Sequence, residues 1–520
     1  MNLPQPSQTK FQTLRLVLGD QLNARHSWFQ QKQSDCLYVL VEAQQEQTYV
    51  RHHIQKIVGF FAAMRNFARA LQDAGHQVLY LSLDHKWQRD SLTATLDQVL
   101  EHYQISAVQL QEPDEYRLDQ QLQDWADSIP ATVSFCSSEH FLTERDALTH
   151  IFKGKKSFLM ETFYRQMRRQ FDILMDGDKP LTGKWNYDHD NREKLPLDHQ
   201  VPEPLLFDND VTEIVALLRA QQVACFGEIN ERAFLWPINR QQAQDLLQFF
   251  LTHCLANFGR YQDALTPADW SLYHSRLSFA LNTKMLHPLM VVRQAVAYWE
   301  QHQSTITIAQ VEGFVRQIIG WREYVRAIYW HHMPAYKTQN FFQFKRQLPA
   351  YFWHGQTKLR CVQHAIKQSL EHAYAHHIQR LMVTGNFCLL TEIAPDEVDA
   401  WYLGIYIDAI EWVELPNTRG MSQFADGGIM ATKPYISGGN YLNKMGHYCQ
   451  DCHYDVKQTT GPRACPFNSL YWRFIDKHQT QLGNNHRMAL VFKNWEKRAP
   501  EDKQAIVAHA DNLLNKIDEL

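Results

Sequence analysis

This chain lacks most features that would place it in a membrane, a secreted scaffold or a common dinucleotide-binding class. No apolar run in its 520 residues approaches the roughly 18 residues that a membrane-spanning helix needs. The N-terminal residues MNLPQPSQTKFQ show no charged-then-apolar signal pattern, so we expect a reducing, cytoplasmic compartment. No GxGxxG motif is present, which argues against the usual dinucleotide site.

The chain also lacks a strong net charge. Its 52 Lys and Arg residues and 56 Asp and Glu residues leave a formal net charge of −4. This balance says nothing about nucleic acid, because only a local basic surface is needed to contact phosphates. One basic run interleaved with aromatic residues contains Lys153, Lys155, Lys156, Arg165, Arg168 and Arg169. It predicts either a solvated helix face or a strip that contacts a nucleic-acid backbone.

Cysteine is scarce, and the nine cysteines are too scattered for a disulfide framework. Cys449 and Cys452 form a CxxC pair, and Cys465 follows with a proline directly after it. This arrangement is typical of ferredoxin-like iron–sulfur ligands, and Cys361 is the best candidate for a fourth thiolate. A zinc knuckle is the alternative, although zinc ribbons usually carry two CxxC pairs and this chain has one.

Short β-rich segments alternate with helical ones in the first part of the chain. Strands are expected at 14–18, 37–41, 78–83, 107–110 and 132–135, and helices at 51–74 and 87–103. The alternation predicts a parallel α/β sheet, whose ligands bind beyond the carboxyl ends of the strands. Gly19, Asp20 and Gln21 follow the first strand at that edge, and Glu46 follows the second.

The later part of the chain is predicted to be almost entirely helical. Helical periods without a convincing sheet occur at 241–257, 288–301, 308–330, 362–383 and 395–413. The segment before them, 138–230, has few clear periods and is expected to be a connector. We therefore expect a Rossmann-like parallel-sheet α/β domain followed by a large all-α domain.

One polar group in the helical part suits a phosphate. Two hydroxyls and a guanidinium surround a predicted helix start at Ser275, Arg276, Leu277 and Ser278. Unpaired backbone N–H groups at such a position favour a pyrophosphate, and an ordinary N-cap is the alternative.

Two further groups suit proton and electron transfer. His376 and His377 cannot both face the same way on a helix, so one could be a general acid while the other orients it. Trp353, Trp401 and Tyr402 favour core packing, or an electron relay if a redox cofactor is near.

Taken in order, these motifs resemble the iron–sulfur bacterial cryptochrome and photolyase family, which includes the prokaryotic (6-4) photolyases. The resemblance covers nearly the whole chain. It is carried by the four cysteines and by 18–22, 275–278, 320–323, 376–386, 412–417, 420–428 and 433–435. It implies an antenna domain at 1–137, a connector at 138–230, and a helical catalytic domain at 231–520 that holds FAD and a 4Fe-4S cluster.

The resemblance also implies roles for particular positions. FAD would be bound by Tyr261, Ser275, Arg276, Leu277, Ser278, Glu323, Asp408 and Glu414. A 6,7-dimethyl-8-ribityllumazine antenna would be bound by Gly19, Asp20, Gln21 and Glu46. The cluster ligands would be Cys361, Cys449, Cys452 and Cys465, and the photoreduction relay Trp353, Trp401 and Tyr402.

The implied function is light-driven repair of (6-4) photoproducts in UV-damaged DNA by a monomer without membrane association. Excited reduced FAD would donate an electron to a flipped lesion, and His377 or His376 would deliver a proton as imidazolium. Alternatives are a cryptochrome-type blue-light photoreceptor that signals through a partner, a cyclobutane-dimer photolyase, and a light-independent iron–sulfur nucleic-acid protein.

Overall fold

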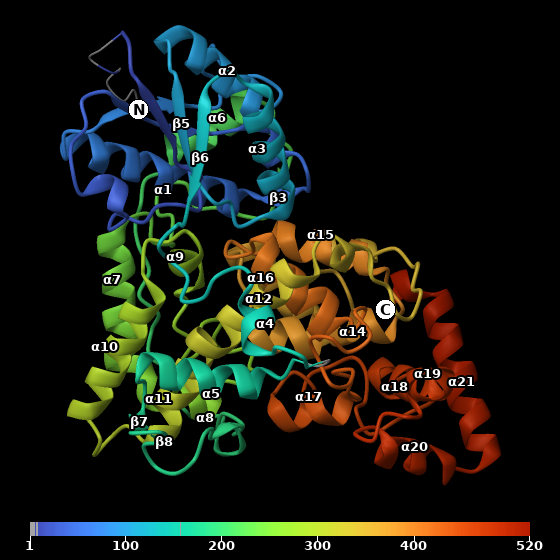
Figure 1. Cartoon of the computed structure of the whole chain (residues 1–520). Coiled ribbons are helices and arrows are strands. Elements are labelled where there is room, and N and C mark those ends of the chain that lie inside the picture. The colour runs from blue at the N-terminus through green and yellow to red at the C-terminus, as the bar shows by residue number, and fades with distance from the viewer. Residues whose placement is uncertain (1–5, 7–8, 156–157) are drawn as a thin grey trace.

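The computed structural model describes residues 6, 9–155 and 158–520. It has an α/β part at the top of Figure 1 and a helical part below it. The α/β part is a five-stranded parallel sheet with strand order β4-β2-β1-β5-β6. Its strands are β1 (Thr13–Leu16), β2 (Cys36–Val41), β4 (Gln77–Leu81), β5 (Ala107–Gln111) and β6 (Thr132–Cys136). The predicted parallel sheet is confirmed.

Side chains that alternate along the strands bury both faces of this sheet. In β2, Tyr38 and Leu40 belong to the core shared with α1 (Ile54–Asp73), whereas Leu37 and Val39 belong to a second core. The second core is closed by α2 (Leu92–Tyr103) and α3 (Tyr116–Ser128). Strands buried on both faces read as continuous apolar runs, as β2 does.

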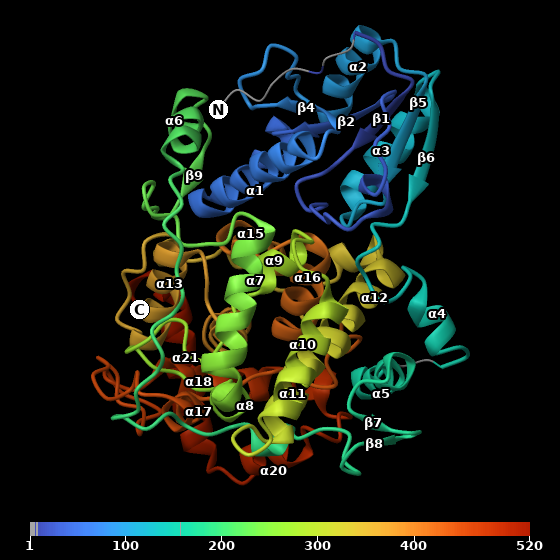
Figure 2. The ribbon, with the colours of Figure 1, turned by 90° about the vertical axis from the view of Figure 1, so that its left-hand side faces the viewer.

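The segment 138–230, which was expected to be a connector, contacts both parts of the molecule. Its first elements are α4 (Ala147–Ile151), α5 (Met160–Phe171), β7 (Met175–Asp176) and β8 (Lys179–Pro180). They lie beside the helical part, and α5 packs against the segment 316–322. This segment then returns to the α/β part, where α6 (Thr212–Ala220) packs on α1, as Figure 2 shows. There β9 (Cys225–Phe226) pairs with β3 (His52–His53).

Helices form the remainder, and no named strand follows β9 in the described part of the chain. In order, they are α7 (Arg240–Phe249), α8 (Leu255–Tyr261), α9 (Ser278–Asn282), α10 (Pro288–Gln301), α11 (Ile308–Val315), α12 (Glu323–His332), α13 (Arg360–His372), α14 (Asn386–Leu390), α15 (Pro395–Ile405), α16 (Glu411–Leu415), α17 (Gly439–Met445), α18 (Pro466–Lys477), α19 (Gln479–Leu482), α20 (Ala489–Glu496) and α21 (Pro500–Asn515). The predicted helix 288–301 coincides with α10, which Pro288 begins.

The single helix predicted at 362–383 is wrong. The helix α13 ends at His372, because Ala373 adopts a left-handed conformation with φ of 51°. A wide π-type turn then runs from Gln379 to Gly385. Similar wide turns occupy Arg316–Arg322 and Pro416–Ser422, and such turns often mark functional sites.

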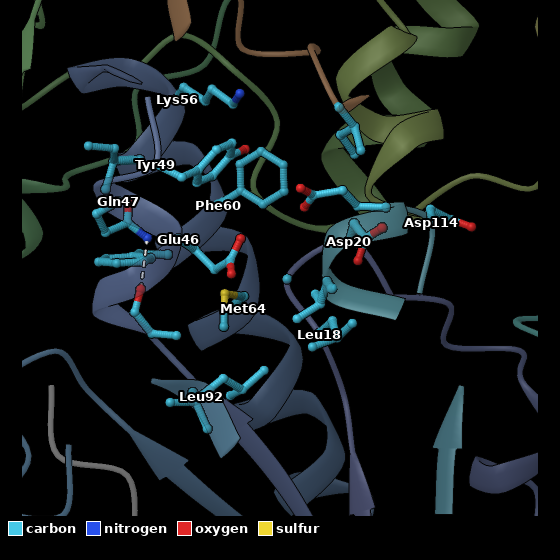
Figure 3. Close-up of a pocket in the computed structure, with 18 of the residues that line it drawn as sticks. Leu18, Asp20, Glu46, Gln47, Tyr49, Lys56, Phe60, Met64, Leu92 and Asp114 are labelled. Atoms are coloured by element: carbon cyan, nitrogen blue, oxygen red, sulfur yellow. Dashed lines mark hydrogen bonds between the residues drawn. The ribbon is translucent and has the colours of Figure 1, made fainter. Parts of the chain in front are cut away.

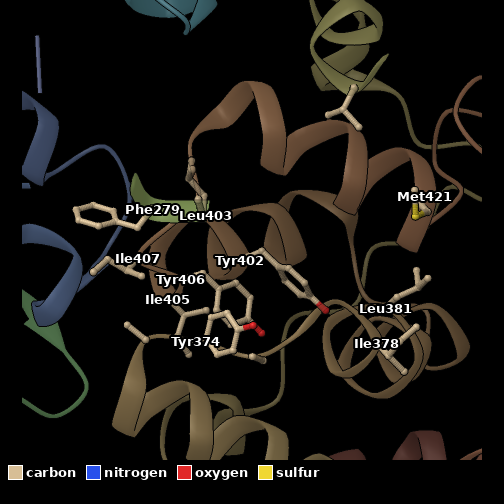
Figure 4. Packing of buried hydrophobic residues seen from close by; sticks show 14 of the residues in the cluster. Phe279, Tyr374, Ile378, Leu381, Tyr402, Leu403, Ile405, Tyr406, Ile407 and Met421 are labelled. Atoms are coloured by element: carbon tan, nitrogen blue, oxygen red, sulfur yellow. The ribbon is translucent and has the colours of Figure 1, made fainter. Parts of the chain in front are cut away.

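The two parts meet closely at Gly59 of α1. A Cβ atom there would lie 3.0 Å from Ile407 Cδ1 and 3.3 Å from the Phe279 ring, so glycine allows α1 to approach the helical part. Figure 4 shows Phe279 and Ile407 at the end of the buried cluster that faces the blue N-terminal ribbon. In the described residues, no helix has both the length and the apolar character to cross a membrane.

Candidate functional site

A cavity of about 970 Å³, including its open mouth, lies between the carboxyl edge of the sheet and the helical part (Figure 3). Gly19 and Asp20 line it beyond β1, and Glu46 lines it beyond β2. Glu411 lines it from the helical part. Three of the four residues expected to bind an antenna are therefore brought together here.

Gln21 is not among the residues that line this cavity. Its side-chain oxygen accepts the Leu18 backbone N–H at 3.0 Å, and its side-chain nitrogen donates to the Gln111 backbone carbonyl at 3.2 Å. The side chain is 1% exposed, so it ties the loop to the neighbouring strand. The sequence correctly placed Gln21 at the sheet edge but could not show which way its side chain turns.

A buried lysine joins the two parts of the chain beside Asp20. Lys284 Nζ lies 2.5 Å from Asp114 Oδ2 and 3.3 Å from Asp20 Oδ2, and its side chain is 1% exposed. Burial raises the pKa of Asp20 to about 6, although Lys284 opposes the rise. Both carboxylates are held in place by one cation from the helical part, which sequence analysis missed.

His52 and Lys56 also line the cavity without having been predicted. Both ring nitrogens of His52 are buried and have no hydrogen-bond partner among the residues described. Lys56 Nζ donates to the Leu403 carbonyl at 2.6 Å, and burial lowers its pKa to about 8. Unpaired buried polar groups beside acidic ones fit a ring ligand with several polar atoms.

A second site centres on Asp408 in the helical part. Arg380 donates to both of its carboxylate oxygens at 3.0 and 3.2 Å, and Ser278 Oγ donates to Oδ2 at 2.6 Å. The Asn282 amide donates to the Asp408 carbonyl at 2.8 Å. The structure therefore brings Ser278 and Asp408 together, and their binding of a cofactor stays a prediction.

The neighbouring segment holds a buried arginine in an unusual conformation. Arg276 has φ of 54° and is 3% exposed, and its guanidinium donates to the Leu205 carbonyl at 2.8 Å. Its buried Nε atom has no partner within the described chain. Ser275 and the buried Leu277 flank it, and Ser275 Oγ accepts the Leu277 N–H at 3.5 Å. This cradle retains one unused donor for an anionic group.

The remaining predicted flavin residues fall into two kinds. Both carboxylate oxygens of Glu414 are buried without a hydrogen-bond partner among the residues described, and burial raises its pKa well above the usual range. Tyr261 is 5% exposed and its ring stacks on Tyr273 at 5.8 Å. By contrast, protein donors already occupy Glu323, which accepts from the Leu142 N–H at 3.1 Å and from Arg322 at 3.3 Å. Glu414 fits a polar cofactor, whereas Glu323 is accounted for by structural contacts.

The two histidines lie in different surroundings. His376 is 3% exposed and stacks on His274, with ring centroids 4.7 Å apart and planes 11° apart. His377 is exposed to solvent yet crowded by protein, and this crowding, followed by the charge of Arg380, lowers its pKa to about 4. Burial also holds the pKa of His376 well below its usual value. Both rings are therefore neutral near pH 7, so the expected imidazolium requires an added negative charge.

The expected relay residues form a chain of aromatic and hydrogen-bond contacts. Tyr402 donates its hydroxyl to the Arg380 carbonyl at 2.6 Å, and its ring lies 5.3 Å from that of Trp401. The buried Trp401 donates to the Phe352 carbonyl at 3.1 Å. The next residue, Trp353, is 37% exposed. Tyr402 and Trp401 are therefore in direct contact, and Trp353 follows Phe352, whose ring lies 5.1 Å from that of Trp401.

Four cysteines gather beside α13 and α18. Cys361 and Cys465 are buried, and Cys449 and Cys452 are partly buried. Cys452 Sγ lies 3.9 Å from the carbonyl of Lys358, three residues before Cys361. Burial, followed by the other three thiols, raises the pKa of Cys361. Among the described residues, no three His, Cys, Asp or Glu side chains could hold a metal ion as they stand. The soft donor set nevertheless fits an iron–sulfur cluster.

Two arginines of the basic run form contacts within the protein, whereas Lys153, Lys155 and Arg169 are exposed. Arg168 is 2% exposed and donates to the carbonyls of Ile173 and Trp185 at 3.1 and 2.9 Å. Arg165 pairs with Glu161 at 2.9 Å. Lys156 lies outside the described residues. Neither Arg165 nor Arg168 is therefore a free phosphate contact.

Comparison with known proteins defines the class of fold. A bacterial class III photolyase from Agrobacterium tumefaciens matches with a TM-score of 0.56 and 14% identity, covering 98% of this chain and 99% of that one. A cryptochrome from Synechocystis sp. PCC6803 matches with a TM-score of 0.55 and 13% identity, covering 96% and 94%. The protein has the photolyase and cryptochrome fold.

Sequence comparison then identifies the family. Residues 15–234 match the model of the deoxyribodipyrimidine photo-lyase-related protein family. A (6-4) photolyase of Agrobacterium fabrum is 40% identical over 509 residues, which covers 97% of this chain and 99% of that protein. The chain therefore belongs to the (6-4) photolyase family.

Proposed function

We propose that this protein repairs (6-4) photoproducts in UV-damaged DNA by light-driven electron transfer. The observation that supports the proposal is that the histidine pair adjoins the Arg380–Asp408 pair, because the Arg380 N–H donates to the His376 carbonyl at 3.1 Å and the Arg380 side chain donates to Asp408. The pair would then be a proton donor next to a cofactor site. When bound, FAD supplies the photoexcited electron. The 40% identity to a (6-4) photolyase over nearly the whole chain supports this reaction over other uses of the fold.

FAD would be held mainly by the Asp408 site and the Arg276 cradle. The unused Nε of Arg276 would pair with a phosphate, and Ser275 and Ser278 would add hydroxyl donors. Glu414, whose pKa burial raises well above its usual range and whose carboxyl oxygens are buried without a partner among the residues described, would contact a polar ring or ribityl group. Tyr402, Trp401 and Trp353 would return electrons from the surface.

His377 would deliver the proton to the lesion. Its pKa of about 4 leaves it neutral in the free protein, so protonation would depend on a nearby DNA phosphate. The buried His376 and its stacked partner His274 would keep the pair in position. Proton delivery would then be confined to the DNA complex, where a flipped lesion meets the ring.

We also propose sites for an antenna and for an iron–sulfur cluster. The cavity lined by Asp20, Glu46 and His52 would hold the ribityllumazine antenna, and the four cysteines would hold a 4Fe-4S cluster. The nine free cysteines suit a reducing cytoplasm, and we propose that the protein acts there as a monomer.

The test uses an oligonucleotide with one (6-4) lesion and the reduced protein under blue light. We expect the near-UV band of the lesion to disappear with the wild type and to persist with His377→Ala, while flavin photoreduction survives in both. Replacement of the fully exposed His189 by alanine provides a matched control. A bound, reduced wild-type protein that leaves the band unchanged would instead support a photoreceptor.

A further inference from the structure

We infer that Gln379 and Tyr448 are positioning residues that fix the histidine pair against the cysteine site. The inference rests on the proposed function and assigns the cysteine site a role in positioning the histidines for that function. Tyr448 precedes Cys449 in the chain, and Gln379 follows the histidine pair. Their side chains meet in the core, where Gln379 Nε2 donates to the Tyr448 hydroxyl at 3.2 Å.

The amide of Gln379 uses all of its hydrogen-bonding capacity. Its oxygen accepts the His376 backbone N–H at 3.0 Å and the Gln368 amide at 3.0 Å. Its nitrogen donates to the Gln368 oxygen at 2.8 Å and to Tyr448. A reversed amide would point N–H groups at the His376 N–H, so the network fixes its orientation. The side chain is 1% exposed, and a fully satisfied buried network of this kind is rigid.

Both ends of this network are anchored beside the cysteines. Gln368 lies on α13, the helix that carries Cys361 at its N-terminal end. Tyr448 is 0% exposed, donates to the Thr266 carbonyl at 3.3 Å and packs on the His364 ring at 5.2 Å. Cys361 and Cys449 therefore lie on the two segments from which the amide network reaches His376.

The contact at His376 is what the network contributes to the site. Gln379 fixes the backbone of His376, and the stack on His274 fixes its ring. His377 follows directly, so the position of its imidazole depends on the same backbone. A displacement of about 1 Å at a reacting group can reduce a rate by roughly a hundredfold.

The first experiment compares Gln379→Met with Gln379→Glu. Methionine keeps the length of the side chain but removes the acceptor, so we expect faster hydrogen exchange across 374–380 and about tenfold slower repair at saturating lesion. Iron content, FAD content and lesion affinity should stay as in the wild type. A protonated glutamate retains the carbonyl acceptor and should restore repair to within about threefold.

Tyr448→Phe removes one hydroxyl and is the milder second variant. We expect a smaller loss of repair, and combining it with Gln379→Met should add little further loss because both act through one network. The control is Gln363→Met, since Gln363 also lies on α13 but donates to the Thr357 carbonyl at 2.9 Å.

Two outcomes would overturn the inference. The first is a folded Gln379→Met protein with wild-type exchange and wild-type repair. The second is loss of iron in that variant with unchanged exchange at 374–380, which would assign the glutamine to the cysteine site alone. Failure of repair by the wild type would instead reject the proposed function, and the exchange measurement would still test the positioning role.

Discussion

Arg380 and Asp408 are joined by two hydrogen bonds of 3.0 and 3.2 Å, although 28 residues separate them in the chain. The Asp408 carboxylate also accepts a hydrogen bond from the Ser278 hydroxyl, and the Asp408 backbone carbonyl accepts one from the Asn282 side chain. One acidic side chain therefore connects three segments at the candidate flavin site.

Replacing Asp408 with asparagine should weaken this site. The substitution keeps the shape but leaves the Arg380 guanidinium without its charged partner, which we expect to destabilise the fold by about 3 kcal/mol. The purified variant should also retain less FAD. Urea unfolding and flavin absorbance measure the two effects, and Glu300→Gln, on an exposed part of α10, is the control. Unchanged stability and flavin content would contradict this role.

Replacing Cys465 with serine should abolish metal loading. Cys465 is 8% exposed directly before α18, so its loss removes a buried ligand of the proposed cluster. We expect iron and labile sulfide to fall to near background in the purified protein, together with the broad visible absorbance. Cys225→Ser, in the distant strand β9, should retain full iron content. Zinc in place of iron in the wild type would favour the knuckle that the spacing left open.

Replacing Asp20 with asparagine should weaken antenna binding and leave FAD in place. The change removes one of the two carboxylates held by Lys284 and alters a polar wall of the cavity. We expect about tenfold lower antenna content, the loss typical of one hydrogen bond to a charged group. Chromophore extraction quantifies antenna and FAD separately. Glu101→Gln, exposed on α2, should leave both contents unchanged.

The stability of the protein should fall as the pH drops from about 6.5 to about 4. The buried His53 ring accepts the Gln55 N–H at Nδ1 at 3.1 Å, and its Nε2 lies 2.8 Å from the Leu370 carbonyl oxygen. Burial lowers the pKa of His53 to about 4. In this window the unfolded chain binds a proton at His53 that the folded chain does not. The contribution of His53 to the free energy of unfolding is therefore fully present above the pKa of about 6.5 that His53 has in the unfolded chain. It falls by about 1.4 kcal/mol per pH unit as the pH drops toward the folded-state pKa of about 4.

The variant His53→Asn tests this pH dependence. Asparagine keeps an acceptor near Nδ1 but cannot titrate, so the slope of unfolding free energy against pH should become shallower by about one proton. His189→Asn, at a fully exposed side chain, should keep the wild-type slope. Equal slopes for wild type and His53→Asn would remove His53 from the explanation.

Short-range sequence patterns were enough to predict those elements whose conformation depends mainly on their own residues. The run of apolar residues at 37–41 predicted a strand, and the structure shows that Tyr38 and Leu37 of β2 face different cores. The helix at 288–301 was recognisable because Pro288 begins it and its apolar period is unbroken. The cysteine spacing was equally local, because a CxxC pair needs only a turn.

Only the tertiary structure decided which distant groups meet. No local pattern pairs Arg380 with Asp408, places Lys284 between Asp20 and Asp114, or turns Gln21 away from the cavity. The Lys284 contacts depend on how the residues after α9 lie against the sheet edge. The Arg380–Asp408 pair depends on how the segments after α13 and after α15 meet. The sequence by itself determined the strands of the five-stranded sheet and several of the longer helices, since these follow from the period of their apolar residues. Pairing and charge state at the sites were set by burial, because desolvation depends on every segment that surrounds a group.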